Sequence, residues 1–383
     1  MTEAITRPTR GKPRLVAVIL GLEGGGAENV FARLVVTLRS EWDIRVVVFN
    51  PGGPYEQFLR ERGIPIRLIS QRQNKIRFIV ALRRFIKSQT PDVVLSFLIY
   101  TNIVTSLALR GTRIPLVMAE HTNYRQGLKG SRFRGIKLAL MKRAYRQGNA
   151  YAVTAISKRV SQMIRDDFSP KAKVVTIANG LDLSLLDSLA REPVPPEFLP
   201  VFQAQTIAVC GRLVPLKNHD MLLRVLATGG ELTKKAHLLI LGLGPHRQNL
   251  QRLAEELGIS NRVHFCGFRK NPHAFVSKAT LFAMTSDYEG YPGALAEAMF
   301  TNGCCVSTDC PTGPNEIIQN GENGLLVPVA GAAELADAIE RLLSDKDLRD
   351  RLRKRARQWA STQEFPDITV ARYEQLLRDA IRP

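Results

Sequence analysis

Short apolar runs rich in β-branched residues alternate with amphipathic stretches along almost the whole chain, and this alternation restricts the possible folds more than any other feature. The runs of the first half are 15–20, 44–49, 66–69, 93–97, 116–119, 152–156 and 174–177. Those of the second half are 206–209, 237–241, 263–265, 281–284, 304–307 and 325–327. Between them lie helical patterns such as 27–38, 76–86 and 133–145. Strands that alternate with helices predict an α/β fold with parallel sheets covered by helices on both faces.

The chain is long enough for two domains, because its 383 residues exceed twice a typical domain size of about 150 residues. The alternation is interrupted at 191–200, where four prolines in ten residues exclude both a helix and a central strand. We therefore predict an N-terminal domain over 1–190, a linker over 191–203 and a C-terminal domain over 204–365. A last helix over 366–383 is expected to pack back on the first domain.

Positive charge is concentrated in the first half of the chain. The whole chain has 54 Lys and Arg against 35 Asp and Glu, a net charge of +19. The first 200 residues hold 32 of the basic and 15 of the acidic residues, a net charge of +17, which leaves +2 for the remainder. Such asymmetry indicates that one face of the N-terminal domain meets an anionic surface, either a membrane or a nucleic acid.

Two stretches of this domain, 121–165 and 62–91, contain many basic residues and no acidic ones. Within 121–165 the apolar residues Phe133, Ile136 and Leu140 recur at helical spacing among the cations, a pattern suited to the surface of an anionic bilayer. The cations of 121–165 are Arg125, Lys129, Arg132, Arg134, Lys137, Lys142, Arg143, Arg146, Lys158, Arg159 and Arg165. Those of 62–91 include Arg72, Lys75, Arg77, Arg83, Arg84 and Lys87. A solvated face whose apolar stripe packs on the sheet is the alternative; we predict peripheral membrane contact through both stretches.

Other features narrow the compartment and the partners. The five cysteines lie in the second half without metal-ligand spacing, which argues for a reducing compartment rather than a disulfide framework. The apolar run 15–22 is expected to be a buried strand rather than part of a signal peptide, and 93–109 is too polar to span a membrane. We expect a cytoplasmic protein, peripheral on the inner face of the cell membrane. No recognised nucleic-acid module is present, so no nucleic-acid partner is expected.

The segment 286–298 carries the strongest chemical pattern. It follows the strand 281–284, so it lies at the carboxyl edge of a sheet, where open α/β sheets bind ligands. With Pro292 at the first helical position, the amides of Gly293, Ala294 and Leu295 become free donors for a diphosphate. Glu297, and Glu289 from the loop, then suit the hydroxyls of a sugar. A capped surface helix with two exposed glutamates is the alternative.

Two cations follow the strand 206–209 at the same kind of edge. Arg212 can form a two-pronged contact with a phosphate, and Lys217 can supply a point charge. A solvated pair of cations is the alternative reading of this spacing.

Taken together, these residues resemble glycosyltransferase family 4, whose members are retaining nucleotide-sugar transferases of the GT-B architecture, with two facing Rossmann-like domains, parallel sheets and a cleft between them. Glu289 and Glu297 match the E-x7-E signature of the family, and Arg212 and Lys217 match its G-R…K motif. The segments 241–245, 262–268, 25–28, 120–121 and 179–182 are similar to further family motifs in the same order along the chain.

The resemblance implies a role for each matching residue. Arg212 and Lys217 would bind the donor diphosphate, Glu297 the ribose, and Glu289 the transferred sugar. His121 would reach that sugar from the other domain, and with Glu289, Arg212 and Lys217 it completes the expected catalytic set. The remaining expected donor-binding residues are backbone or turn positions: Gly290, Tyr291, Pro292, Gly293, Ala294, Leu295, Gly267, Phe268, Gly25 and Gly26.

The resemblance also implies transfer without a metal or other cofactor. Asp345 and Asp347 superficially match a metal-binding D-x-D, but their place at a helix start favours a capping role. No carboxylate is placed securely as a nucleophile, and the family favours front-face displacement.

The predicted function is transfer of a hexose or N-acetylhexosamine from a nucleotide sugar, with UDP expected, to a lipid-linked or cell-surface glycan. The alternatives are a transferase with a soluble acceptor, a nucleotide-sugar epimerase of the same fold and, more remotely, a basic nucleic-acid-binding protein.

Overall fold

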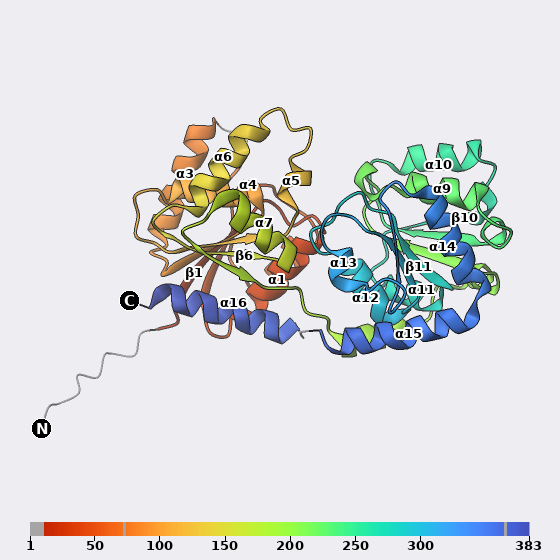
Figure 1. The fold of residues 1–383 in the computed structure, drawn as a ribbon. Helices are drawn as coiled ribbons and strands as arrows, with labels where there is room; N and C mark the ends of the chain where they lie inside the picture. The colour runs from red at the N-terminus through yellow and green to blue at the C-terminus, as the bar shows by residue number, and fades with distance from the viewer. Residues whose placement is uncertain (1–10, 72–73, 364–365, 383) are drawn as a thin grey trace, which may run out of the picture. The chain divides into compact units, whose positions relative to one another are not determined.

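The computed structural model describes residues 11–71, 74–363 and 366–382. The chain forms two compact units, each with its own parallel sheet (Figure 1). The first unit comprises Met1–Asn179 and Asp367–Pro383, and the second comprises Gly180–Pro366. Within the predicted basic stretches, Arg72 lies outside the described residues.

The first unit is built on a parallel sheet of seven strands in the order β3-β2-β1-β4-β5-β6-β7. The strands are β1 (Arg14–Ile19), β2 (Asp43–Val48), β3 (Ile66–Leu68), β4 (Val93–Phe97), β5 (Leu116–Glu120), β6 (Ala150–Ala155) and β7 (Lys173–Thr176). Every residue of β4 and β5 is buried, since helices cover both faces of the sheet. All strands predicted for this half are present, with bounds within two residues of the prediction.

The helices of the first unit follow the strands in turn. They are α1 (Gly26–Leu38), α2 (Pro54–Glu61), α3 (Lys75–Ser88), α4 (Ile99–Ala108), α5 (Tyr124–Gly127), α6 (Arg134–Tyr145) and α7 (Lys158–Phe168). The uncharged segment 93–109 consists of β4, the residue Leu98 in a left-handed conformation, and α4. None of the helices in the described ranges is both long and apolar enough to cross a bilayer.

The last helix, α16 (Pro366–Ile381), belongs to the first unit and lies beside α1 in Figure 1. Its residues Tyr373 and Leu377 are buried in the same core as strands β1, β2 and β4. The Tyr373 hydroxyl lies 3.0 Å from Thr154 Oγ1, and Thr369 Oγ1 donates to Ala178 O at 2.9 Å. The chain therefore completes the first unit with its final residues.

The chain passes from the first unit to the second at Asn179–Gly180, earlier than the predicted linker 191–203. Helix α8 (Leu183–Arg191) and the 3-10 helix η1 (Pro196–Gln203) both belong to the second unit. Val194 and Val201 are buried in the core of that unit. The 3-10 helix η1 begins at Pro196 and contains Pro200. The proline-rich segment is thus packed structure rather than an exposed connection.

The second unit has a parallel sheet of six strands in the order β10-β9-β8-β11-β12-β13. Its strands are β8 (Thr206–Cys210), β9 (His237–Leu241), β10 (Val263–Gly267), β11 (Leu281–Met284), β12 (Cys305–Thr308) and β13 (Leu325–Val327). Each corresponds to a predicted strand. The strand order reverses between β8 and β11, and in such sheets the loops that follow these two strands form the natural ligand site.

Helices again cover the sheet of this unit on both faces. They are α9 (His219–Thr228), α10 (Arg247–Glu256), α11 (His273–Lys278), α12 (Gly293–Thr301), α13 (Pro314–Ile317), α14 (Ala332–Ser344) and α15 (Lys346–Ser361). Short 3-10 helices lie at η2 (Pro215–Lys217), η3 (Thr233–Lys235) and η4 (Ser260–Arg262). All five cysteines are free thiols in this unit, and four of them are buried.

Candidate active site

The loops after β8 and β9 approach each other so closely that two glycines are required. A Cβ atom on Gly242, whose φ is +151°, would overlap the carbonyl oxygen of Gly211. A Cβ atom on Gly244 would overlap Leu213 O in the same way. The Leu213 amide donates to Leu243 O at 2.9 Å, which joins the two loops side by side. The segment that carries Arg212 is therefore held by backbone contacts, while the Arg212 side chain is exposed.

The loop after β8 is also tied to the loop after β11. Asn218 Nδ2 donates to Asp287 Oδ1 at 3.0 Å, and Thr285 Oγ1 donates to Lys217 O at 2.9 Å. The Asp287 amide donates to Leu216 O at 2.9 Å. Asn218 has a φ of +48°, a left-handed conformation that Asn tolerates better than most residues. These bonds fix Lys217 next to the segment predicted to hold the sugar.

Lys217 and Glu289 form an ion pair at the centre of this edge. Lys217 Nζ donates to Glu289 Oε1 at 2.5 Å, and the two side chains are only 22% and 13% exposed. Ser286 Oγ donates to the same carboxylate oxygen at 2.7 Å. Thr312 Oγ1 donates to the backbone carbonyl of Glu289. The carboxylate predicted for the sugar and the cation predicted for the diphosphate are therefore adjacent and oriented.

Helix α12 begins one residue later than predicted, so one predicted amide donor is wrong. Pro292 is the N-cap of the helix rather than its first residue, and the helix starts at Gly293. The Leu295 amide donates to Pro292 O at 3.0 Å, which removes it from the set of free donors. The first two amides of the helix, those of Gly293 and Ala294, have no carbonyl partner inside it and lie at the positive end of its dipole.

Glu297 lies in the second turn of α12 and is half-buried. Its Oε2 atom is 3.9 Å from Nε2 of His273, the first residue of α11. Burial lowers the pKa of His273 to about 4, so the imidazole is neutral at pH 7 and can offer Glu297 only a neutral N–H. Sequence reasoning missed His273, because neither a motif nor its spacing marks it; only the packing of α11 beside α12 brings it to Glu297.

Two apolar side chains stand exposed at the ends of β9 and β10. Gly267 is in a left-handed conformation, and the following Phe268 is 64% exposed. Leu243 is 52% exposed, and the Gly242 amide donates to Gly267 O at 2.9 Å, which joins the two turns. An exposed aromatic ring such as Phe268 can stack on a planar ring system.

His121 follows β5 at the carboxyl edge of the sheet in the first unit. Its ring stacks on Phe97 with a centroid distance of 4.7 Å, and Phe97 stacks in turn on Tyr373 of α16. Burial lowers the pKa of His121 to about 4. The imidazole is therefore neutral near pH 7 and can act as a hydrogen-bond partner, but not as a cation.

A buried polar network, which sequence reasoning missed, lies next to His121. The Tyr145 hydroxyl donates to Glu120 Oε1 at 2.5 Å, and Asn102 Nδ2 donates to the same oxygen at 2.8 Å. Ser96 Oγ donates to Asn102 Oδ1 at 2.5 Å. Burial raises the pKa of Glu120 to about 7. Apolar neighbours in the sequence gave no signal that four polar side chains would meet here.

The predicted glycine-rich loop begins α1. Gly24 has a φ of +121°, so this position needs glycine for its conformation. A Cβ atom on Gly25 would meet only the end of the Glu28 side chain. A Cβ atom added to Gly26 would have no heavy atom of the described residues within 4 Å, apart from its chain neighbours and its own helix backbone. The surface beside Gly26 is thus open, as close approach of a substrate would require.

Comparison with known proteins agrees with this arrangement. Residues 24–185 match the family described as "Glycosyltransferase Family 4", and residues 200–359 match "Glycosyl transferases group 1". The chain belongs to glycosyltransferase family 4. Its fold is the two-domain GT-B fold of that family, and its activity is that of a hexosyltransferase.

The names of two similar proteins refer to glycan assembly. An α-1,4-N-acetyl-D-galactosaminyltransferase of Campylobacter jejuni that acts on a diphospho-undecaprenol glycan is 27% identical over 89% of this chain and 92% of its own length. The lipopolysaccharide core biosynthesis glycosyltransferase LpsE of Rhizobium meliloti is 25% identical over 92% of this chain and 96% of its own length. The structure of Anabaena HepE, solved in complex with UDP, is similar with a TM-score of 0.81. It is 20% identical in sequence, and the match covers 96% of this chain and 100% of HepE.

Each unit of this family 4 transferase thus carries its own share of the predicted site residues. Arg212, Lys217, Glu289, Glu297 and Phe268 follow strands of the second sheet. Gly290, Tyr291, Pro292 and Gly267 lie in the same loops. His121, Gly25 and Gly26 follow strands of the first sheet.

The predicted cap role of Asp345 is confirmed, because its carboxylate accepts from the Leu348 amide at 2.8 Å at the start of α15. In the described part of the chain, no three His, Cys, Asp or Glu side chains form a group that could hold a metal ion.

Proposed function

We propose that this family 4 transferase moves a hexose or N-acetylhexosamine from a UDP-sugar to a lipid-linked or cell-surface glycan, with retention at the anomeric carbon. The observation that carries the proposal is the Lys217–Glu289 pair beside the start of α12. A diphosphate there would meet the amides of Gly293 and Ala294, the Lys217 ammonium and the guanidinium of Arg212. The UDP complex of the structurally similar HepE supports UDP as the nucleotide.

The proposed reaction is a front-face displacement without a metal or other cofactor. The acceptor oxygen attacks the anomeric carbon from the side on which the nucleoside diphosphate leaves. The bond from that carbon to the phosphate oxygen breaks, and the leaving oxygen takes the proton of the acceptor hydroxyl. Arg212, Lys217 and the α12 amides stabilise the charge that develops on the phosphate. Glu289 orients the sugar.

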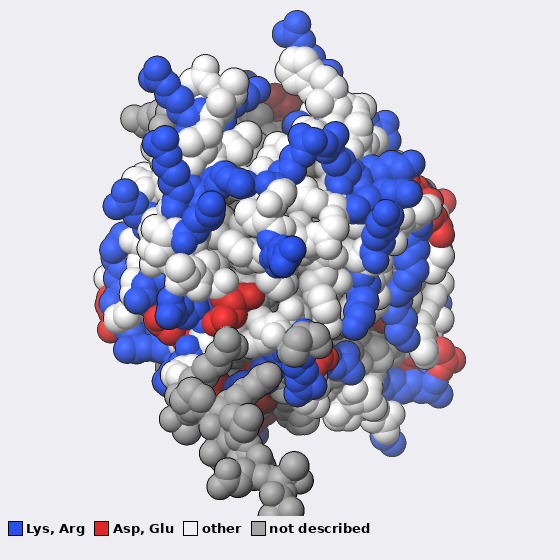
Figure 2. Space-filling view, turned by 90° about the vertical axis from the view of Figure 1, so that its left-hand side faces the viewer, with Lys and Arg blue, Asp and Glu red and all other residues white. Residues whose placement is uncertain are grey.

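The lipid-linked acceptor is proposed from two independent lines. The names of similar proteins include substrates built on diphospho-undecaprenol. The first 200 residues carry a net charge of +17, and two stretches of basic residues, 62–91 and 121–165, contain no acidic residue. In the view of Figure 2, Lys and Arg side chains spread widely while Asp and Glu form a few small groups. We place the protein on the inner face of the cell membrane, held by this charge.

Two measurements test the proposal. The first is the thermal shift of the protein with UDP, GDP, ADP and CMP, in wild type and in Glu297→Ala. Stabilisation by UDP that the variant loses is expected, and no shift with any nucleotide would overturn the donor site. The second is incubation with labelled UDP-sugars and a membrane extract. Label in the lipid-extractable fraction is expected, whereas label that stays on a nucleotide as another epimer, or only in water-soluble glycan, would refute the lipid-linked acceptor.

A further inference from the structure

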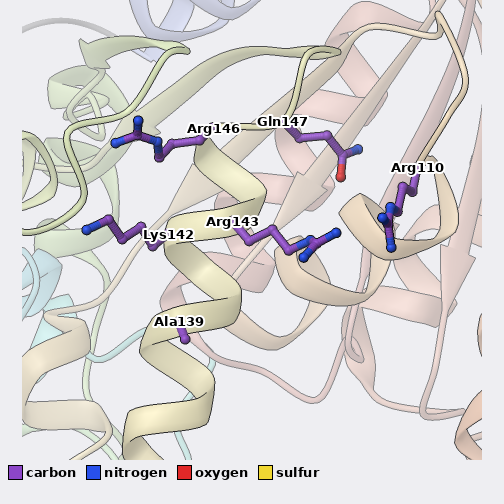
Figure 3. A pocket seen from close by; sticks show the side chains of 6 residues that line it. All are labelled: Arg110, Ala139, Lys142, Arg143, Arg146 and Gln147. Atoms are coloured by element: carbon purple, nitrogen blue, oxygen red, sulfur yellow. The ribbon is translucent and has the colours of Figure 1, made fainter.

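The last turns of α6 line a hollow in the first unit that contains four cations. Its volume is about 460 Å³, and Figure 3 shows the side chains around it. The lining residues are Arg110, Ala139, Lys142, Arg143, Arg146 and Gln147. Arg110 follows the end of α4, and the other residues belong to α6 and to the segment after it. Arg143 and Arg110 extend toward the same space beside Gln147 in Figure 3, and Lys142 and Arg146 extend from the other side of α6.

The backbone around this hollow is held in place by hydrogen bonds. Arg83 Nη1 donates to both Ala108 O and Arg110 O at 2.8 Å, which fixes the chain where α4 ends. Gln147 Nε2 donates to Ser106 O at 3.1 Å, and Gln147 Oε1 accepts from Ser106 Oγ at the same distance. The hollow is therefore part of the folded unit rather than a gap between loose side chains.

No carboxylate of the described residues forms an ion pair with the four cations, Arg110, Lys142, Arg143 and Arg146. The carboxyl end of α6 attracts cations through its dipole, but that end is equivalent to only about half an elementary charge. The guanidinium groups of Arg110 and Arg143, which extend toward the same space, thus favour an anion. Guanidinium groups suit a phosphate because they can donate two bonds to it.

Exposed apolar side chains share the same helix with this hollow. Phe133, the N-cap of α6, is 55% exposed, and Ile136 is 60% exposed. Ile136, Ala139 and Arg143 follow each other at spacings of three and four, so they lie on one face of the helix. With a rise of 1.5 Å per residue, the apolar end precedes the cationic end by about 10 Å. The polarity of this face changes along the helix axis instead of around it.

We propose that this hollow binds the phosphate of an anionic phospholipid headgroup while Phe133 and Ile136 enter the acyl boundary, so that α6 meets the bilayer with its first turn deepest. A helix that lies flat needs an apolar face along its whole length. In α6 the two strongly exposed large apolar side chains, Phe133 and Ile136, both lie at its start, where Arg134 and Lys137 flank them. The proposal rests on the membrane contact proposed above and adds a specific headgroup site to it.

The test is partition of the full chain onto vesicles of phosphatidylcholine with 30% phosphatidylglycerol, at fixed ionic strength. The variant Arg110→Gln/Arg143→Gln removes two cations from the hollow, and Arg33→Gln/Lys171→Gln removes two exposed cations elsewhere on the same unit. At about fivefold per cation near the surface, the first variant is expected to lose roughly 25-fold in partition and the control much less. Glycerol 1-phosphate is expected to reduce the partition of the wild type onto the vesicles by competing for the hollow. It should not reduce the partition of Arg110→Gln/Arg143→Gln.

The possible outcomes separate this inference from the membrane proposal. Equal losses in the two variants would show that only diffuse charge matters, which would overturn the headgroup site and leave membrane contact intact. If the wild-type protein does not partition onto anionic vesicles, both the headgroup site and the membrane contact are refuted. The depth is tested with Phe133→Trp and Ala139→Trp, each in a Trp42→Phe/Trp359→Phe background, and lipids brominated deep in the acyl chain. Stronger quenching at position 133 is expected, and equal quenching at both positions would refute the inclined helix.

Discussion

Lys217 Nζ lies 2.5 Å from Glu289 Oε1, so the cation expected to hold the donor diphosphate is engaged by the carboxylate expected to hold the donor sugar. A diphosphate that enters this site competes with Glu289 for Lys217, and the sugar hydroxyls then compensate Glu289. The pair keeps both side chains oriented while the site is empty, which lowers the cost of ordering them on binding.

The two members of this pair are expected to affect binding in opposite directions. Lys217→Met should weaken UDP affinity by about 10- to 100-fold, the range for a lost hydrogen bond to a charged group. Glu289→Gln should bind UDP as tightly as wild type or more tightly, because Lys217 is released, while transfer falls by about 10²- to 10³-fold. Calorimetric titration with UDP and initial rates measure the two effects. Weaker UDP binding by Glu289→Gln would contradict the competition.

Phe268 is expected to contact the nucleobase. Phe268→Ala should lower UDP affinity by roughly three- to tenfold, the usual worth of an aromatic contact. The melting temperature should not change, because the side chain is 64% exposed. Leu199→Ala, which truncates another exposed apolar side chain of the same unit, provides the control. If the two variants bind UDP with equal affinity, the nucleobase does not contact the turn that carries Phe268.

Two glycine substitutions separate folding from substrate approach. Gly242→Ala should destabilise the second unit by about 2 kcal/mol or more, since its Cβ would overlap Gly211 O at a φ of +151°. Gly26→Ala should leave stability unchanged or slightly higher, because its Cβ meets open space at a helix start. Transfer by Gly26→Ala should nevertheless fall if substrate lies against that backbone. Full activity would show that position 26 is only a helix start.

The pKa values of Glu120 and His121 predict pH effects of opposite sign. Glu120 has a folded pKa of about 7 and an unfolded value near 4.5, so the folded chain binds more protons between these values and loses stability as pH rises through them. His121 has a folded pKa of about 4 and an unfolded value near 6.5, so the folded chain loses stability as pH falls from 6.5 to 4.

Glu120→Gln isolates the first of these effects. Between pH 5 and pH 8.5 its stability relative to wild type should increase by about 2–3 kcal/mol, because the amide has no charge to bury. Denaturant unfolding followed by Trp42 fluorescence in a Trp359→Phe background reports on the first unit. Glu23→Gln, which alters an exposed carboxylate, should show no such trend. A flat difference for Glu120→Gln would mean that Glu120 is ionised in the folded protein at pH 5.

The strands could be predicted from the sequence because parallel strands buried on both faces appear as continuous apolar runs, as in β4 and β5. The packing of the predicted linker 191–203 could not be predicted from the sequence. Prolines mark backbone that cannot be regular, but whether few contacts cross such a segment depends on tertiary packing, and here Val194 and Val201 enter a core.

The candidate site divides in the same way. Loops that follow parallel strands must share an edge, so the neighbourhood of Lys217, Glu289 and Glu297 followed from the strand pattern. The ion pair itself did not, since its members are separated by 72 positions and meet through backbone bonds between two loops. The segment 120–121 matches a family motif, but neither the buried network around Glu120 nor the role of His273 could be predicted, because both depend on tertiary packing that buries the two groups and alters their pKa values.

The return of α16 to the first unit has a consequence for biosynthesis. Residues 180–366 leave the ribosome as one uninterrupted segment, so the second unit can fold as soon as it is made. The first unit emerges earlier but lacks Tyr373 and Leu377 until α16 has been synthesised. The part of the protein that is synthesised first is therefore the part that is completed last, and a nascent chain halted before residue 367 would carry an open apolar groove next to β1 and α1.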